Sequence, residues 1–175
     1  MPFITERDRV EEFENLKEVL DELEVAAEII PSGEGLEQSC LLICLPTGTE
    51  DWEEEYKTDL HIASAYLIQL DEDESQLTKY LMLYMPIQVD LKGADDLAIL
   101  RLVNEVNQEI SFGTCFYGKE PTTDRMLLQI KWLIGGAVDS FLDEGVICET
   151  IFELGGIYDR LKERLLELSE VSVGV

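Results

Sequence analysis

Few residues in this chain of 175 could perform nucleophilic, acid–base or metal chemistry, because it has one histidine and four cysteines. His61 stands in no recognisable arrangement with a serine or cysteine nucleophile, so we expect it to be structural. Cys40 and Cys44 lie about 13 Å apart in an extended chain, too far for a disulfide. With Cys115 and Cys148 they lack the spacing of a zinc site. We therefore expect buried, reduced thiols.

Two acidic clusters, residues 53–55 and 71–74, have the charge to attract calcium ions. Neither has the ligand spacing, the glycine and the terminal glutamate of an EF-hand loop, so we expect solvated loops. The chain also lacks a glycine-rich phosphate loop and a GxSxG nucleophile motif. The sequence thus predicts no catalytic residue, no metal and no cofactor, and a protein that is not an enzyme.

The charge of the chain is strongly acidic. Thirty-eight acidic residues oppose thirteen basic ones, which gives a formal net charge of -25. Such a surface repels nucleic-acid backbones and anionic membranes, whereas it attracts a basic peptide or protein. The acidity would equally serve solubility alone, for instance in a salty cytoplasm, and both explanations stay open. The charged N-terminus resembles no signal peptide and no apolar run approaches ~20 residues, so we expect a cytoplasmic protein.

The periodicity of apolar residues predicts the elements that would position a site. Thr5 and Asp8 are typical of a capping box, and apolar residues then recur every three or four positions from Phe13 to Ile30, which predicts one helix. Three strand-like segments follow, at residues 40–45, 57–70 and 79–91. Their connections are too short for helical crossovers, so an antiparallel meander is expected.

The second half of the chain predicts two helices around a hairpin. One helix should begin near Asp95 and end at Ile110, and a hairpin should then pair residues 112–117 with 125–134. Gly135-Gly136 is expected to end that hairpin. Asp139 or Ser140 should cap the last helix, whose apolar residues recur from Ile147 to Leu168. Gly155-Gly156 lies inside this pattern, where either the helix kinks or another backbone packs close.

These elements give the order αβββαββα. We expect an α+β fold with an antiparallel five-stranded sheet and helices packed on it. No linker or internal repeat divides the chain, so residues 1–175 are expected to form a single domain.

One segment resembles a known family. It is LVNEVNQEISFG, which contains Asn104, Asn107, Phe112 and Gly113 and precedes the strand TCFY. These residues, and the later MLLQIKWLIGG, are similar to the YbjN-like family, whose members are labelled as bacterial sensory-transduction regulators. The clear likeness covers about residues 95–136, and the chain departs from the family in its greater length, mainly through the acidic connector at 50–55.

The resemblance implies a fold and a kind of partner. YbjN-like domains share the fold of type III secretion chaperones, which are small, acidic, cytoplasmic and usually dimeric, and which hold an extended segment of a client protein. A secretion-chaperone-like fold is therefore implied for this chain. This likeness of fold and charge raises the expectation of polypeptide binding without establishing it.

The residues of the motif have structural as well as functional interpretations. Asn104 and Asn107 would either hydrogen-bond a partner or fasten the end of their helix to an adjacent loop or strand edge. Gly113 is expected to serve backbone geometry, as a bulge or a close approach.

Apolar side chains on both faces of the third strand predict a partner surface. Tyr80, Met82 and Tyr84 lie opposite the Leu81, Leu83 and Met85 face, so a second face must meet a client or a dimer mate unless a helix covers each face. We expect Tyr80, Met82 and Tyr84, with the first helix, to bind a client. The second helix and residues 112–117, including Phe112 and Phe116, are expected to form a homodimer.

The expected function is a non-enzymatic module that binds a polypeptide through apolar sheet and helix surface. The alternative is a sensory or regulatory domain that binds a small ligand in the groove between sheet and helices.

Overall fold

A computed structural model describes residues 4–33, 35–46, 61–69, 77–87, 91, 93–111, 113–120 and 125–173. The elements in chain order are α1 (Glu6–Glu22), β1 (Ala27–Ile30), β2 (Cys40–Cys44), β3 (Ile62–Ile68), β4 (Thr78–Ile87), α2 (Asp96–Glu109), β5 (Gly113–Lys119), β6 (Met126–Ala137) and α3 (Glu144–Val173). The predicted α+β class is confirmed. Within the described ranges, no helix is long and apolar enough to cross a bilayer.

The strands form one six-stranded sheet in the order β1-β2-β3-β4-β6-β5, and every neighbouring pair is antiparallel. The predicted meander is therefore correct for β2 to β4, and so is the β5–β6 hairpin. The predicted end at Gly135-Gly136 is wrong, because β6 continues through both glycines and pairs with β4. Their missing side chains make room: the Tyr80 ring lies over Gly135, and Leu142 fills the space beside Gly136.

The sixth strand is β1, which the sequence had assigned to the end of the first helix. The helix stops at Leu23, and Glu24 takes a left-handed conformation with φ 59°. Glu24 N donates to Asp21 O and Val25 N donates to Leu20 O, the hydrogen bonds of a Schellman motif. Ala27–Ile30 then pairs with β2. Apolar residues three apart fit a helix as well as a strand, so strand pairing decided between them.

Glu24 gives a first prediction. Because a side chain in the left-handed region costs about 1 kcal/mol and glycine does not, Glu24→Gly should raise the free energy of unfolding by about 0.5–1 kcal/mol. Glu18→Gly, at an exposed position inside α1, should instead lower it by about 1 kcal/mol. Urea unfolding of both variants tests this prediction. Equal losses in the free energy of unfolding would contradict the left-handed cap at Glu24.

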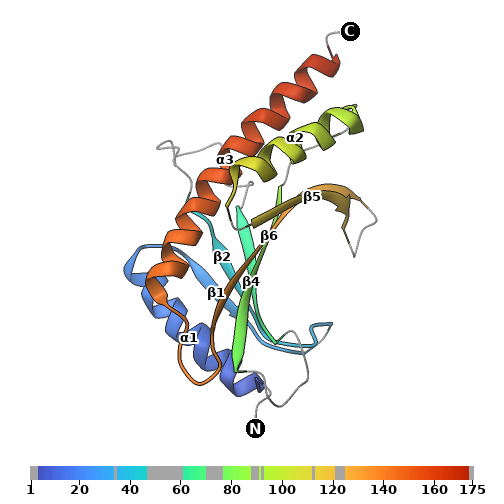
Figure 1. The fold of residues 1–175 in the computed structure, drawn as a ribbon. Helices are drawn as coiled ribbons and strands as arrows, with labels where there is room; N and C mark the ends of the chain where they lie inside the picture. The colour runs from blue at the N-terminus through green and yellow to red at the C-terminus, as the bar shows by residue number, and fades with distance from the viewer. Residues whose placement is uncertain are drawn as a thin grey trace.

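All three helices contribute to one hydrophobic core on one face of the sheet. Phe13, Leu16 and Leu20 of α1 are buried there with apolar residues of α2 and α3. The strands supply alternate residues, such as Leu81, Leu83, Met85 and Ile87 of β4. In Figure 1, α1 and the first half of α3 lie to the left of β4, while α2 lies above β5.

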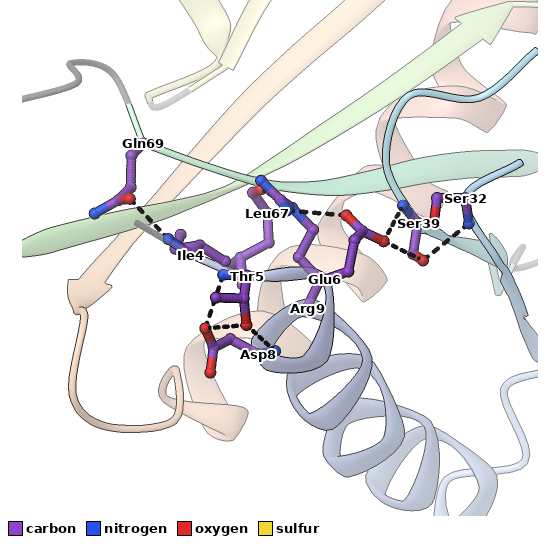
Figure 2. Close-up of polar contacts among 9 residues, drawn as sticks. All are labelled: Ile4, Thr5, Glu6, Asp8, Arg9, Ser32, Ser39, Leu67 and Gln69. Atoms are coloured by element: carbon purple, nitrogen blue, oxygen red, sulfur yellow. Dashed lines mark hydrogen bonds and ion pairs between the residues drawn. The ribbon is translucent and has the colours of Figure 1, made fainter. Parts of the chain in front are cut away.

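Polar contacts tie the start of α1 to the sheet (Figure 2). Thr5 and Asp8 form the predicted capping box. The Glu6 carboxylate accepts from both the backbone N, at 3.0 Å, and the hydroxyl, at 2.7 Å, of Ser39, which lie just before β2. These bonds lower the pKa of Glu6. Arg9 donates to Glu6 and to the Leu67 carbonyl of β3.

The start of α3 differs from the prediction. The structure also shows which of the two alternatives holds at Gly155-Gly156, a kink or a close backbone. Asp143, not Asp139 or Ser140, caps it, because the Asp143 carboxylate accepts from Val146 N at 3.0 Å. A backbone does pack close at Gly155, where an added Cβ would overlap the carbonyl oxygen of Pro46.

Candidate functional site

The face of the sheet that points away from the helices is the candidate site, and we call it the open face. The strands alternate, so in β3 and β4, and in β2 from Leu41 onward, the neighbours of the core residues are half-buried while the core residues are buried. Two rows of paired residues cross it. The first row is Leu42, Ser64, Tyr84, Lys131 and Thr114; the second is Tyr66, Met82 and Leu133.

Among the described residues, the helices pack against the other face only. Of the two possibilities for β4, a helix over each face is not observed among the described residues: one face meets the helices, and Tyr80, Met82 and Tyr84 lie on the other. Each of these three side chains is half-buried, and Leu133 beside Met82 is 42% exposed. An apolar surface of this kind is typical of a site where another molecule binds.

Tyr84 joins the apolar centre of the open face to a polar edge. Its hydroxyl donates to the Oε1 atom of Gln129, and Gln129 Nε2 donates to Gly118 O at 3.2 Å. Burial raises the pKa of Tyr84, and the negative charge of Glu120 raises it further. The phenol is thus neutral at physiological pH, and it acts as a hydrogen-bond donor that holds the buried Gln129 in place.

The remaining aromatic residues of the predicted surface lie around this centre. Tyr80 packs across Gly135 in the neighbouring strand, and its ring would be 3.3 Å from a Cβ at that position. Phe116 pairs with Gln129 and is half-buried on the same face. Phe112 lies outside the described residues. The structure thus brings Tyr80, Met82, Tyr84 and Phe116 to one face from two strands that are not neighbours.

The first helix does not belong to this surface. Its apolar residues, Phe13, Leu16 and Leu20, are at most 1% exposed because they pack in the core on the other side of the sheet. The prediction that α1 forms one client surface with Tyr80, Met82 and Tyr84 is therefore wrong, because the apolar side of α1 and these three residues lie on opposite sides of the sheet. A period of 3.6 shows that a helix has an apolar face but not which side of the sheet it covers.

Asn107 has the structural role that the sequence allowed. Its Nδ2 donates to Cys115 O at 2.9 Å, and its Oδ1 accepts from Cys115 N at 2.8 Å, as a neighbouring strand would. The amide thereby fastens α2 to the edge strand β5 and closes that edge at this point. Asn104 is exposed on the same helix.

Gly113 serves a close approach, as expected. It pairs with Trp132, and a Cβ at Gly113 would lie 2.7 Å from the Trp132 ring. Replacing Gly113 would therefore displace a core tryptophan. The motif Asn107 to Gly113 positions β5 against α2 and β6.

The thiols and the histidine are the residues in which the sequence analysis looked for chemistry. All four cysteines are free, and burial raises the pKa of Cys115 to about 12, so this thiol is unreactive at neutral pH. The His61 ring packs edge-on against Tyr158 of α3 at 4.2 Å between centroids. Within the described part of the chain, no three His, Cys, Asp or Glu side chains gather to hold a metal ion.

A second feature is a hollow of about 400 Å³ between α2 and α3. Its apolar residues are Ala98, Leu102 and Leu168, and its charged residues are Arg101, Glu105, Arg164 and Glu167. Arg164 forms ion pairs with Glu105 and Glu109 across the two helices. Because Arg101, Glu105 and Glu167 are exposed, this is a surface hollow and not an enclosed pocket.

Comparison with protein-family models and with curated proteins finds no match for this chain.

Not every residue of the open face was singled out from the sequence, and Gln129 and Lys131 are the polar side chains of β6 that were missed. Gln129 and Lys131 lie in β6 between apolar neighbours, and their alternation with Ile130 and Trp132 was the available signal. Gln129 is 2% exposed, and Lys131 is exposed. The pairing of β6 with β4, which places them beside Tyr84, could not be predicted from the order of the strands alone.

Proposed function

We propose that this protein is a non-enzymatic binding module that holds a polypeptide on the open face of its sheet. The observation that carries the proposal is the half-exposed apolar surface made by Tyr66, Met82, Tyr84 and Leu133, over which no described helix packs. Aromatic and methionine side chains of this kind supply large contact areas and adapt to different partners. The net charge of -25 would steer a partner of net positive charge toward the protein.

The same proposal includes membership of the YbjN-like family and the secretion-chaperone-like fold. It is supported by the motif around Asn107 and Gly113, whose residues join α2 to β5, and by the shared order of elements from α2 to α3. A chaperone-like or regulatory role in the cytoplasm follows from that resemblance.

Met82→Asp tests the proposal. Met82 lies between Tyr66 and Leu133 at the centre of the open face, and a carboxylate there would oppose apolar contact. We expect loss of polypeptide capture, by at least about tenfold, with a thermal unfolding transition close to that of the wild type, because Met82 is only half-buried. Capture is measured by affinity pull-down and mass spectrometry at low and high salt.

Phe152→Asp is the matched control. Phe152 is 48% exposed on α3, which packs on the other face of the sheet. This control should leave capture unchanged. If both variants retain the same polypeptides as the wild type, the open face is not the binding surface. Tyr84→Asp is a less clean test, because Tyr84 also holds Gln129.

A homodimer is part of the proposal, with the outer surface of α2 as its interface. Leu97 and Leu100 are 54% and 49% exposed there, although their helix packs its other side in the core. Light scattering coupled to gel filtration would measure the mass, and a monomer at micromolar concentration would contradict the dimer.

The hollow between α2 and α3 favours a second candidate function, the binding of a small ligand. An apolar floor with Arg101 beside it suits a small amphipathic anion. A thermal-shift screen with such compounds separates the two candidates, because it detects a ligand in the hollow but requires no polypeptide.

A further inference from the structure

Lys131 is a positive charge beside the apolar centre of the open face. It is exposed in the first row of the open face, between Tyr84 on β4 and Thr114 on β5. Along β6 its neighbours on the same face are Gln129 and Leu133. Lys131 forms none of the ion pairs or hydrogen bonds found among the described residues, in a chain with thirty-eight acidic side chains.

Glu28 and Glu120 are described acidic residues on the same side of the sheet as Lys131. Glu28 is in the same row but on β1, four strands from β6, or about 19 Å at the usual strand spacing. Glu120 follows β5, six residues beyond Thr114, and its charge acts on Tyr84, whose pKa it raises. In the described part of the chain no acidic side chain forms an ion pair with Lys131, and the Lys131 side chain is exposed to water.

Binding of a polypeptide would change the surroundings of the Lys131 ammonium group. A polypeptide that covers Tyr84 and Leu133 passes beside Lys131, because Lys131 pairs with Tyr84 and is the neighbour of Leu133 on the same face of β6. An ammonium group removed from water without a counter-charge is costly, whereas one that meets a carboxylate is compensated and fixes the register of the partner.

We infer that the bound polypeptide carries an acidic residue, flanked by apolar residues, that pairs with Lys131, and that Lys131 is the specificity-determining residue of the open face. This inference rests on the proposed function and deepens it. It also separates two effects of charge: the long-range field of the protein favours a partner with a net positive charge, while the contact at Lys131 selects one carboxylate within the bound segment.

Selection from a phage library of random 12-residue peptides tests the inference, with the full chain as bait. The wild type should enrich peptides in which an Asp or Glu stands among apolar residues. Lys131→Glu should instead enrich Lys or Arg at the corresponding position. Lys17→Glu is the matched control on α1, which packs on the other face of the sheet, and it should enrich the same peptides as the wild type.

The best wild-type peptide then allows a charge-swap measurement by fluorescence anisotropy. Lys131→Glu should weaken its binding about tenfold or more, and changing the acidic residue of the peptide to lysine should restore binding to that variant. Lys131 is exposed, so the variant should unfold at the temperature of the wild type.

The outcomes separate the two proposals. If the wild type enriches no peptide, or if Met82→Asp enriches the same peptides, the proposed function fails. A second group of outcomes leaves the proposed function intact. The enriched peptides depend on Met82 but contain no preferred acidic residue, or Lys131→Glu binds them as tightly as the wild type does. In that case the Lys131 side chain reaches back to water in the complex, and the inference is overturned.

Discussion

Replacing Gly155 with alanine should lower the free energy of unfolding by about 3 kcal/mol or more, although it adds a single methyl group. Gly155 is a buried residue in the middle of α3, and the carbonyl oxygen of Pro46, just after β2, occupies the place of a side chain. An alanine there overlaps backbone and not the end of a flexible side chain. Either α3 or the chain after β2 would have to move, and both are anchored in the core.

Gly156→Ala is the matched control, because nothing lies within 4 Å of the corresponding Cβ and the residue is exposed. This substitution should raise the free energy of unfolding by up to about 1 kcal/mol, since alanine favours the helix. Urea unfolding of both variants measures the difference. A similar effect of the two substitutions would show that α3 does not approach Pro46 as described.

Breaking the buried ion pair between Glu12 and Lys79 should be at least as costly. Lys79 Nζ lies 2.5 Å from Glu12 Oε2, and the two residues are 6% and 1% exposed. The other carboxylate oxygen of Glu12 accepts from Leu142 N at 2.8 Å. Glu12 therefore joins α1, β4 and the segment that leads into α3.

Glu12→Gln preserves the size of the side chain and an acceptor for Leu142 N, but it leaves the ammonium group of Lys79 buried without a counter-charge. We expect a loss of about 3–5 kcal/mol in the free energy of unfolding. The double variant Glu12→Gln with Lys79→Met should recover part of that loss, because it removes the uncompensated charge. A double-mutant cycle from urea unfolding measures the coupling.

Glu11→Gln is the control on the surface of the same helix. It breaks the ion pair between Arg7 and Glu11, whose side chains are 85% and 49% exposed. The loss should be within about 0.5 kcal/mol, because water already screens both charges. If Glu12→Gln were no more harmful than Glu11→Gln, the buried pair would not hold α1 to the sheet.

Much of the fold could be predicted because local patterns agreed with tertiary packing. Thr5 with Asp8, and Asp95 with the backbone of Leu97, cap their helices as expected. The alternation in β3 and β4 marked both strands, and the short connections required them to be antiparallel. The exception is β1, where Ala27 and Ile30 fit the helical period and only pairing with β2 made a strand.

The candidate site could be predicted in its residues but not in its assembly. Tyr80, Met82 and Tyr84 were identified because both faces of their strand are apolar. Lys131 and Gln129 were missed because they come from β6, which joins β4 through a pairing between distant segments of the chain. Asn107 was identified with two interpretations, and the position of Cys115 decided between them.

The sequence by itself determined where the helices and most strands lie, since hydrophobic period, caps and turns are properties of neighbouring residues. The tertiary structure alone decided which face of the sheet the helices cover. An apolar residue on a strand is compatible with either face until the helices have packed, and burial of Phe13, Leu16 and Leu20 in the same core as Leu83 and its neighbours placed them on one side. Tyr80, Met82, Tyr84 and Lys131 were thereby left together on the other.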